Sequence, residues 1–306
     1  NGLSFKFDIE SEIPSLILFS NATYTLNLMS LIEDEQFGVN SLKILNEMPI
    51  IHNFSISFNS DENDQADKSN EFKNCNGDWN KFLSFDNPNH LIYHLNTIGN
   101  YIDGNDKEWI GSFFKTGGAL RLINLLLKTE NNSSFNSDLK NEFLLLLLLL
   151  IKKLFSLEFN DEMSQIIQKV DNKEFVNFLN YTCKLFSNDD ISYYLLYVIE
   201  KMTIIKGIPQ ENVDCYVELF SLSCFQSNEK IVKIATEFLH KKEIESMMIM
   251  IKLLPKAVNT NNCDFVNSIV SLVSSQSDDK ELIWNALLDS TFEYFSPLKN
   301  KDVVGI

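Results

Sequence analysis

The stretch from Asp78 to Lys128, DWNKFLSFDNPNHLIYHLNTIGNYIDGNDKEWIGSFFKTGGALRLINLLLK, decides the fold that this sequence predicts. Its apolar residues recur at helical spacing in three successive segments, 88–102, 106–115 and 118–129. Pro88 suits the first residue of a helix, because its ring fixes the backbone angle and no amide donor is needed there. Consecutive helices joined by short turns form a building unit of a stacked-helix scaffold.

A glycine pair, Gly117 and Gly118, separates the last two of these segments. A phosphate-binding loop would need further glycines, a Lys-Ser/Thr pair and a preceding strand, and the sequence around the pair lacks this pattern. We instead expect Gly117 to end one helix in the left-handed conformation and Gly118 to allow close backbone approach at the start of the next. The pair is therefore predicted to be structural.

The helical pattern continues along the chain, and many of its segments begin with an Asp or Asn that can cap the first turn. The further predicted helices are 138–159, 172–186, 189–205, 213–223, 228–240, 243–254, 264–274 and 278–295. The composition agrees, because 10 Gly and 6 Pro are few for a fold with many tight turns. Helix pairs that recur about every 40 residues have the period of HEAT and armadillo arrays. The predicted fold class is all-α, an irregular armadillo/HEAT-like α-solenoid.

We expect one elongated helical-repeat region over residues 1–306, since the chain exceeds the usual size of a single core. One segment is almost without apolar residues, with six acids against two lysines over 61–78, and predicts a disordered loop. High β-propensity at 5–9 and 54–58 allows short extended segments. The expected divisions are N-terminal helices at 13–58, the acidic loop at 59–77, the tryptophan and double-glycine unit at 78–129, and further stacked helix pairs at 138–306.

The charge balance argues against nucleic acid as a partner and is most simply a solvated surface that keeps an apolar-rich chain soluble. The chain has 26 basic and 42 acidic residues, a formal net charge of -16, which repels phosphate backbones and anionic lipid headgroups. Its most apolar run, from Phe143 to Ile151, is far shorter than the roughly 20 residues of a membrane-spanning helix. We expect this run to be a fully buried helix, and we expect no membrane insertion.

The five cysteines are scattered without CxxC spacing, and their odd number argues against a closed disulfide framework. A reducing compartment follows, so the predicted location is the cytoplasm, with the nucleus left open. The first residues, NGLSFKFDIESEI, have neither an initiator Met nor the features of a secretory signal. They suggest a piece of a longer polypeptide.

Two places were candidates for chemistry. His90 and His94 are four residues apart and share a helical face, but the HExxH pattern and a third ligand are missing, so hydrogen-bonded surface histidines are the favoured interpretation. Cys215-Tyr216 resembles the end of a cysteine-protease nucleophile motif, but it lies in an apolar helical pattern without the Gly-Asn approach. We expect Cys215 to be a packed helix cysteine. The sequence therefore predicts no catalytic, metal-binding or cofactor-binding residue.

A Trp-x-x-Phe/Leu-Leu element, then Leu-Ile/Leu-Tyr-x-Leu, then Trp-x-x-x-Phe-x-x-x-Gly-Gly-x-x-x-Leu follow one another in this chain. The positions are Trp79, Leu83, Leu91, Tyr93, Leu95, Trp109, Phe113, Gly117, Gly118 and Leu122. This order resembles the non-catalytic helical region of very large ubiquitin-specific proteases of the fat-facets type. Upstream, IPSLILFSNATYTLNLMSLI (13–32) and SLKILNEMPI (41–50) extend the resemblance, which covers about 13–155.

In that family the helical array lies ahead of the catalytic domain. The resemblance therefore implies a non-catalytic scaffold segment of a ubiquitin carboxyl-terminal hydrolase, which positions ubiquitinated substrates or adaptors for a catalytic cysteine-protease domain outside this chain. Neither the nucleophile box nor the histidine box of the family occurs in the 306 residues. The alternative is an armadillo-type domain of a formin-like or other cytoskeletal scaffold, which shares the Gly-Gly pattern and would bind a GTPase or a partner helix. An α-helical enzyme is the third hypothesis.

Overall fold

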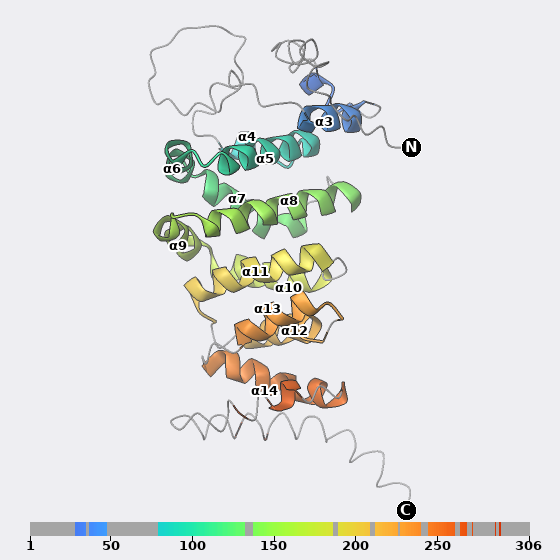
Figure 1. The fold of residues 1–306 in the computed structure, drawn as a ribbon, viewed down its shortest axis with the longest axis vertical. Helices are drawn as coiled ribbons and strands as arrows, with labels where there is room; N and C mark the ends of the chain where they lie inside the picture. Colours follow the sequence, from blue (N-terminus) through green and yellow to red (C-terminus); the bar gives the residue numbers. More distant parts are fainter. Residues whose placement is uncertain are drawn as a thin grey trace, which may run out of the picture. The chain divides into compact units, whose positions relative to one another are not determined.

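The computed structural model describes most of the chain from Leu28 onward, and all regular secondary structure in the described residues is helical (Figure 1). These residues are 28–34, 37–47, 79–131, 137–185, 189–208, 212–225, 227–239, 244–260, 264–267, 271, 285 and 288. The all-α prediction is confirmed for them. The predicted acidic loop at 59–77 and the extended segments at 5–9 and 54–58 lie outside the described residues.

The described helices up to residue 259 follow the predicted order closely, whereas the helices expected over 264–274 and 278–295 lie largely outside the described residues. They are α3 Gly38–Glu47, α4 Trp79–Phe82, α5 Pro88–Asp103, α6 Lys107–Lys115, α7 Gly118–Leu127, α8 Ser137–Ser156, α9 Asn160–Lys169, α10 Asn172–Thr182, α11 Asp189–Lys206, α12 Val213–Ser223, α13 Glu229–Leu239 and α14 Ile244–Asn259, with 3-10 turns η3 Thr129–Asn131 and η4 Cys183–Leu185. Among the described helices none is long and apolar enough to cross a membrane.

Several predicted helix ends differ from the structure, and the largest difference among the described helices is at α14. The helix expected to end at Leu254 continues through Pro255 to Asn259. Proline removes one backbone donor and strains the preceding turn, which is why the sequence suggested a stop there. The last turn of α14 is nevertheless held by tertiary contacts, because Ala257 is fully buried and the Lys256 ammonium donates to Ser221 Oγ at 2.8 Å.

The chain divides into two compact units, and each is described by itself. Unit 1 comprises residues 1–126 and 131–154, and unit 2 comprises 127–130 and 155–306. Whether the chain forms the single region expected from its length stays a prediction. The leucine run of α8 lies in unit 1, and Phe143, Leu147 and Ile151 are fully buried. The prediction of a helix buried on all sides is wrong for one side of the run, where Leu145, Leu146 and Leu149 are half-buried.

Unit 1 is organised around Trp79, which is only 3% exposed. Its indole Nε1 donates to Thr116 Oγ1 at 3.0 Å, and its ring packs edge-on against Phe113 with 5.0 Å between centroids. Gly118 lies directly beneath both rings, since a Cβ there would meet the Phe113 ring and would approach Trp79 to 2.9 Å. The close approach expected at Gly118 is thus confirmed, and it depends on the absence of a side chain.

Gly117 has a φ of +88°, the left-handed conformation expected of it. Beyond the pair, Arg121 in α7 reaches back to α4, where its Nε and Nη2 both donate to the carbonyl oxygen of Leu83, at 3.0 and 2.5 Å. A guanidinium satisfies a carbonyl at a helix end that lacks an intrahelical partner. The sharp turn at Gly117 therefore returns the chain to the helix that begins the unit.

In unit 2 each helix packs against the next but one. The contacting pairs are α9 with α11, α10 with α12, α11 with α13 and α12 with α14. In Figure 1, α10 and α11 (yellow) share one tier, α12 and α13 (orange) share the next, and α14 follows. The buried faces are apolar, as in α11, where Leu195, Val198 and Met202 are fully buried. Stacking of this kind buries each amphipathic face on both neighbours.

Polar contacts fix the register of these pairs. At the C-terminal ends, the Lys206 ammonium of α11 donates to the carbonyl oxygen of Val170 after α9 at 2.8 Å. At the N-terminal ends, Asn228 before α13 donates to the Asp189 carboxylate of α11 at 2.9 Å. Both contacts join like ends, so α9 runs parallel to α11 and α11 runs parallel to α13.

The same contacts recur at a nearly constant sequence separation. In unit 2 the separation is 36 residues for Lys206 to Val170, 39 for Asn228 to Asp189 and 38 for Lys252 to Asp214. Within unit 1 it is 37 for Trp79 to Thr116 and 38 for Arg121 to Leu83. Two helices and their turns therefore make up one structural period, close to the period of about 40 residues expected from the sequence.

The glycine pair gives the first prediction. Gly117→Val should lower the free energy of unfolding by about 1–2 kcal/mol, because valine resists the left-handed conformation. Gly118→Val should cost more, about 3 kcal/mol, because the new side chain must displace the rings of Phe113 and Trp79. Urea unfolding followed by far-UV circular dichroism measures both. A Gly118→Val protein more stable than Gly117→Val would contradict this packing.

The second prediction concerns the tie between α9 and α11. Lys206→Met keeps the apolar stem but removes the ammonium that Val170 and Ile167 accept from, so we expect unit 2 to lose about 1–2 kcal/mol. Lys169→Met, at an exposed lysine in the last turn of α9, is the matched control and should change stability by less than about 0.5 kcal/mol. Equal losses in the two variants would argue against the tie.

Candidate functional site

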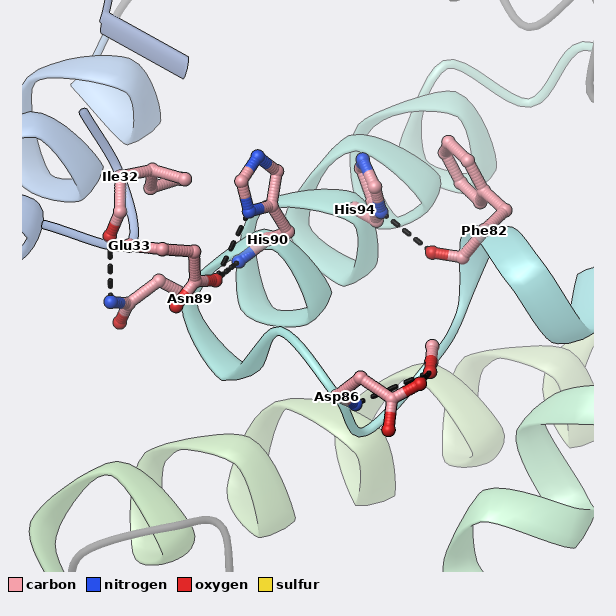
Figure 2. A network of polar contacts seen from close by, with 8 residues as sticks. Ile32, Glu33, Phe82, Asp86, Asn89, His90 and His94 are labelled. Atoms are coloured by element: carbon pink, nitrogen blue, oxygen red, sulfur yellow. Dashed lines mark hydrogen bonds and ion pairs between the residues drawn. The ribbon is translucent and has the colours of Figure 1, made fainter. Parts of the chain in front are cut away.

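The histidine pair belongs to a polar network at the start of α5, drawn in Figure 2. The Glu33 carboxylate accepts from the backbone N–H of His90 at 2.9 Å and lies 3.0 Å from its ring Nδ1. The Asn89 side-chain amide donates to the carbonyl oxygen of Ile32 at 2.7 Å. Residues 32–33 are thereby fastened to the first turn of a helix that begins more than fifty residues later.

Glu33 caps the N-terminus of α5 in place of a residue next to that helix in the sequence. Asn87 precedes α5 but its side chain makes no capping hydrogen bond, and Pro88 occupies the first turn. The first amides of a helix need acceptors and favour negative charge, and Glu33 supplies both from outside the helix. Gly38 allows this arrangement, because a Cβ there would meet the carbonyl oxygen of Ile32 and lie 3.3 Å from Asn89 Nδ2. These contacts form a polar clasp that joins the first turn of α5 to Ile32, Glu33 and Gly38.

His94 lies one turn further along α5 and points elsewhere. Its Nδ1 is 2.8 Å from the carbonyl oxygen of Phe82, and its ring stacks on the Phe82 ring at 3.8 Å between centroids. A carbonyl accepts, so Nδ1 carries the proton of a neutral imidazole. His94 is only 8% exposed. The expectation of two surface histidines is therefore wrong for His94, although both are hydrogen-bonded as expected.

Burial lowers the pKa of His94 to about 3, and its hydrogen bond to Phe82 only partly opposes this effect. The ring is consequently neutral at physiological pH. His90 and His94 each direct Nδ1 to a separate protein acceptor, so the two rings do not converge on a shared point. Among the residues that the structure describes, no group of three or more His, Cys, Asp or Glu side chains could hold a metal ion.

Cys215 and Tyr216 lie in the first half of α12, as the apolar helical pattern predicts. Burial, with Asp214 and Glu218 nearby, raises the pKa of the Cys215 thiol, and burial raises that of Cys183 to about 11. Tyr216 is fully buried and its hydroxyl is 2.9 Å from Thr203 Oγ1 in α11. A thiol kept protonated in this way is a poor nucleophile, because the thiolate is the reactive form.

No protein-family model, no curated protein and no solved structure matches the chain. The resemblance of the segment from Trp79 to Lys128 to large ubiquitin-specific proteases therefore stays a prediction. The structure adds one fact to it. Trp79, Phe113 and Gly118, three of the positions that carry the resemblance, form one packed cluster in unit 1.

Sequence reasoning missed Glu33 and the burial of His94. Glu33 had no local signal, since its partner His90 lies 57 residues away. His94 follows Leu91 by three residues and precedes Leu95, so its place on the edge of the apolar stripe was a usable signal. Arg121 was likewise missed, because its acceptor is a backbone carbonyl that no sequence pattern marks.

The buried histidine predicts a pH dependence. In the unfolded chain His94 gains a proton below about pH 6.5, whereas in the folded protein it stays neutral down to about pH 3. Its contribution to stability is therefore complete above pH 6.5 and is lost as the pH falls, by roughly 1.4 kcal/mol per pH unit in that window. His94→Gln, which does not titrate, should remove this slope from urea-unfolding data collected across the window.

His90→Gln removes the other histidine of the helix and is the matched control for His94→Gln. Because His90→Gln leaves His94 and its contact with Phe82 in place, the slope that His94 causes should remain. A slope that is unchanged in His94→Gln, or flattened equally in both variants, would contradict the burial of a neutral His94.

Proposed function

We propose that this chain is an irregular α-solenoid of armadillo/HEAT type that binds other proteins and carries out no reaction itself. The observation that supports it is the recurrence of polar contacts between helices two apart at separations of 35 to 39 residues. Solenoids of this kind present extended surfaces whose residues come from successive repeats, which suits the binding of proteins. The charge of -16 favours partners that are basic, at least in part.

The polar side chains inside the helix stack support a scaffold for a second reason. Three basic side chains donate hydrogen bonds to backbone carbonyls of another helix, namely Arg121, Lys206 and Lys256. His94 does the same with the carbonyl of Phe82. Groups engaged in this way hold helices together, and rearranging them for chemistry would leave buried carbonyls without donors.

We further propose that the segment belongs to a large ubiquitin-specific protease and positions ubiquitinated substrates or adaptors for a catalytic domain elsewhere in that protein. This proposal is supported by the resemblance over 13–155. The tight packing of Trp79, Phe113 and Gly118 explains why these residue types would be kept together in such a motif. Formin-like scaffolds share the Trp-x-x-x-Phe-x-x-x-Gly-Gly pattern and remain the alternative.

The coding sequence downstream of Ile306 separates these two proposals. A nucleophile box with cysteine and a histidine box would support the protease, and an actin-binding region of the formin type would support the cytoskeletal alternative. A continuation with neither feature would refute both assignments, although the solenoid itself would stand.

The absence of catalysis is tested on the chain alone. Hydrolysis of a ubiquitin substrate with a C-terminal fluorophore should be indistinguishable from buffer, because burial and nearby carboxylates keep Cys215 protonated. Cys215→Ala and Cys183→Ala are the matched variants, and neither should change the signal. Turnover by the unmodified chain that Cys215→Ala abolishes would overturn the proposal.

A further inference from the structure

The outer side of α11 in unit 2 differs from the outer sides of its neighbours. Tyr193, Tyr197, Glu200 and Ile204 recur at i, i+4, i+7 and i+11 and so lie on one side of the helix. The tyrosines are partly exposed, and Ile204 is 51% exposed. The opposite side of α11 supplies core residues such as Leu195 and Met202. We call Tyr193, Tyr197 and Ile204 the α11 surface.

Polar faces flank the α11 surface on both sides. On α9, which packs against α11, Gln165 and Gln168 are exposed. On α13, which packs against its other side, the exposed residues Lys233 and Glu237 form an ion pair at 3.8 Å. The exposed side chains of both neighbouring helices are therefore polar, whereas the α11 stripe carries two tyrosines and an isoleucine with Glu200 between them.

The two tyrosines are held in place by ring contacts. Tyr193 packs edge-on against Tyr194 at 5.1 Å between centroids, and the Lys201 ammonium lies 5.3 Å from the Tyr197 ring centroid. Side chains that are already ordered lose little entropy when a partner docks on them. Tyrosine also offers a large apolar face with a polar tip, which is why it is frequent among residues that dominate binding energy.

One end of the α11 surface is acidic. Because α9, α11 and α13 run parallel, their N-terminal ends share one edge of unit 2, next to Tyr193. The first turns there carry exposed carboxylates, which are Asp161, Glu162, Asp189, Asp190 and Glu229. Lys230 is the neighbouring exposed base on α13. A partner that covers the stripe and reaches this edge meets a surplus of negative charge.

We propose that the α11 surface binds an amphipathic segment of a partner protein that has apolar side chains along one face and a cluster of lysine or arginine at one end. The apolar face covers Tyr193, Tyr197 and Ile204, and the basic end lies over the acidic N-terminal edge. From Tyr193 to Ile204 the stripe is about 17 Å long, which matches about three turns of a partner helix. This assignment rests on the proposed scaffold function and names a surface for it.

Charge also decides between this partner and a second copy of the chain. Two copies meeting through their α11 surfaces would bring two net charges of -16 together, which costs free energy. Acidic amphipathic segments are disfavoured for the same reason. Charge therefore favours a basic segment of another protein as the molecule that covers the α11 surface.

The test uses the full chain and a fluorescein-labelled helical peptide of about 14 residues, with leucines on one face and lysines at one end. Binding is followed by fluorescence anisotropy. We expect saturable binding, and Ile204→Glu and the double variant Tyr193→Ala/Tyr197→Ala should each weaken it at least about tenfold. A peptide with glutamate in place of every lysine should bind at least about tenfold more weakly.

Val39→Glu is the matched control, because Val39 is an equally exposed aliphatic residue, at 53%, in unit 1. It should leave peptide affinity unchanged, and circular dichroism should show that every variant remains helical. The assignment would be overturned if the peptide showed no saturable binding, or if Ile204→Glu left its affinity unchanged. It would also be overturned if the free chain sedimented as a dimer that Ile204→Glu dissociates. These outcomes leave the scaffold proposal open, since turnover and the downstream coding sequence test that separately.

Discussion

The helices of unit 2 bury their apolar faces chiefly by packing against the helix two positions along the chain. The pairs α9 with α11 and α11 with α13 show the constraint, because the core residues of α11 are enclosed from both sides. Apolar burial supplies most of the free energy of such a stack, but it does not by itself fix how far one helix slides along another. The polar contacts do, since Lys206 joins the C-terminal ends and Asn228 joins the N-terminal ends.

Unit 1 follows the same constraint with different chemistry. Trp79 joins α4 to the end of α6, Arg121 joins α7 to the end of α4, and Gly118 makes room for the tryptophan and phenylalanine rings. The two adjacent glycines thus have different structural roles. Gly117 acts through its left-handed backbone angle and Gly118 through its missing side chain. The clasp of Glu33 and Asn89 fastens the preceding segment to α5 across a long stretch of intervening sequence.

The proposed function follows from how the polar residues are used. Donors inside the stack are committed to carbonyl oxygens of neighbouring helices, so they stabilise the architecture. The candidate nucleophile Cys215 is held protonated, and His94 is held neutral. Half-buried tyrosines and an exposed isoleucine on α11, next to an acidic edge, offer a surface suited to recognition. A scaffold that binds basic, amphipathic segments accounts both for the polar residues used inside the stack and for the side chains on the outer side of α11.

The sequence by itself determined the helices and their order, because the spacing of apolar residues, the capping residues and the glycine pair act within a few positions of one another. It also identified Gly117 and Gly118 correctly, since their roles are local. It could not locate the partners of Glu33, Arg121 or Lys206, whose acceptors or donors lie 36 to 57 residues away. It ended α14 at Leu254, because local propensity outweighed packing that is only visible once α12 is beside it. The tertiary structure decided that His94 is buried and that α11 has an aromatic outer side, because burial depends on which helices meet.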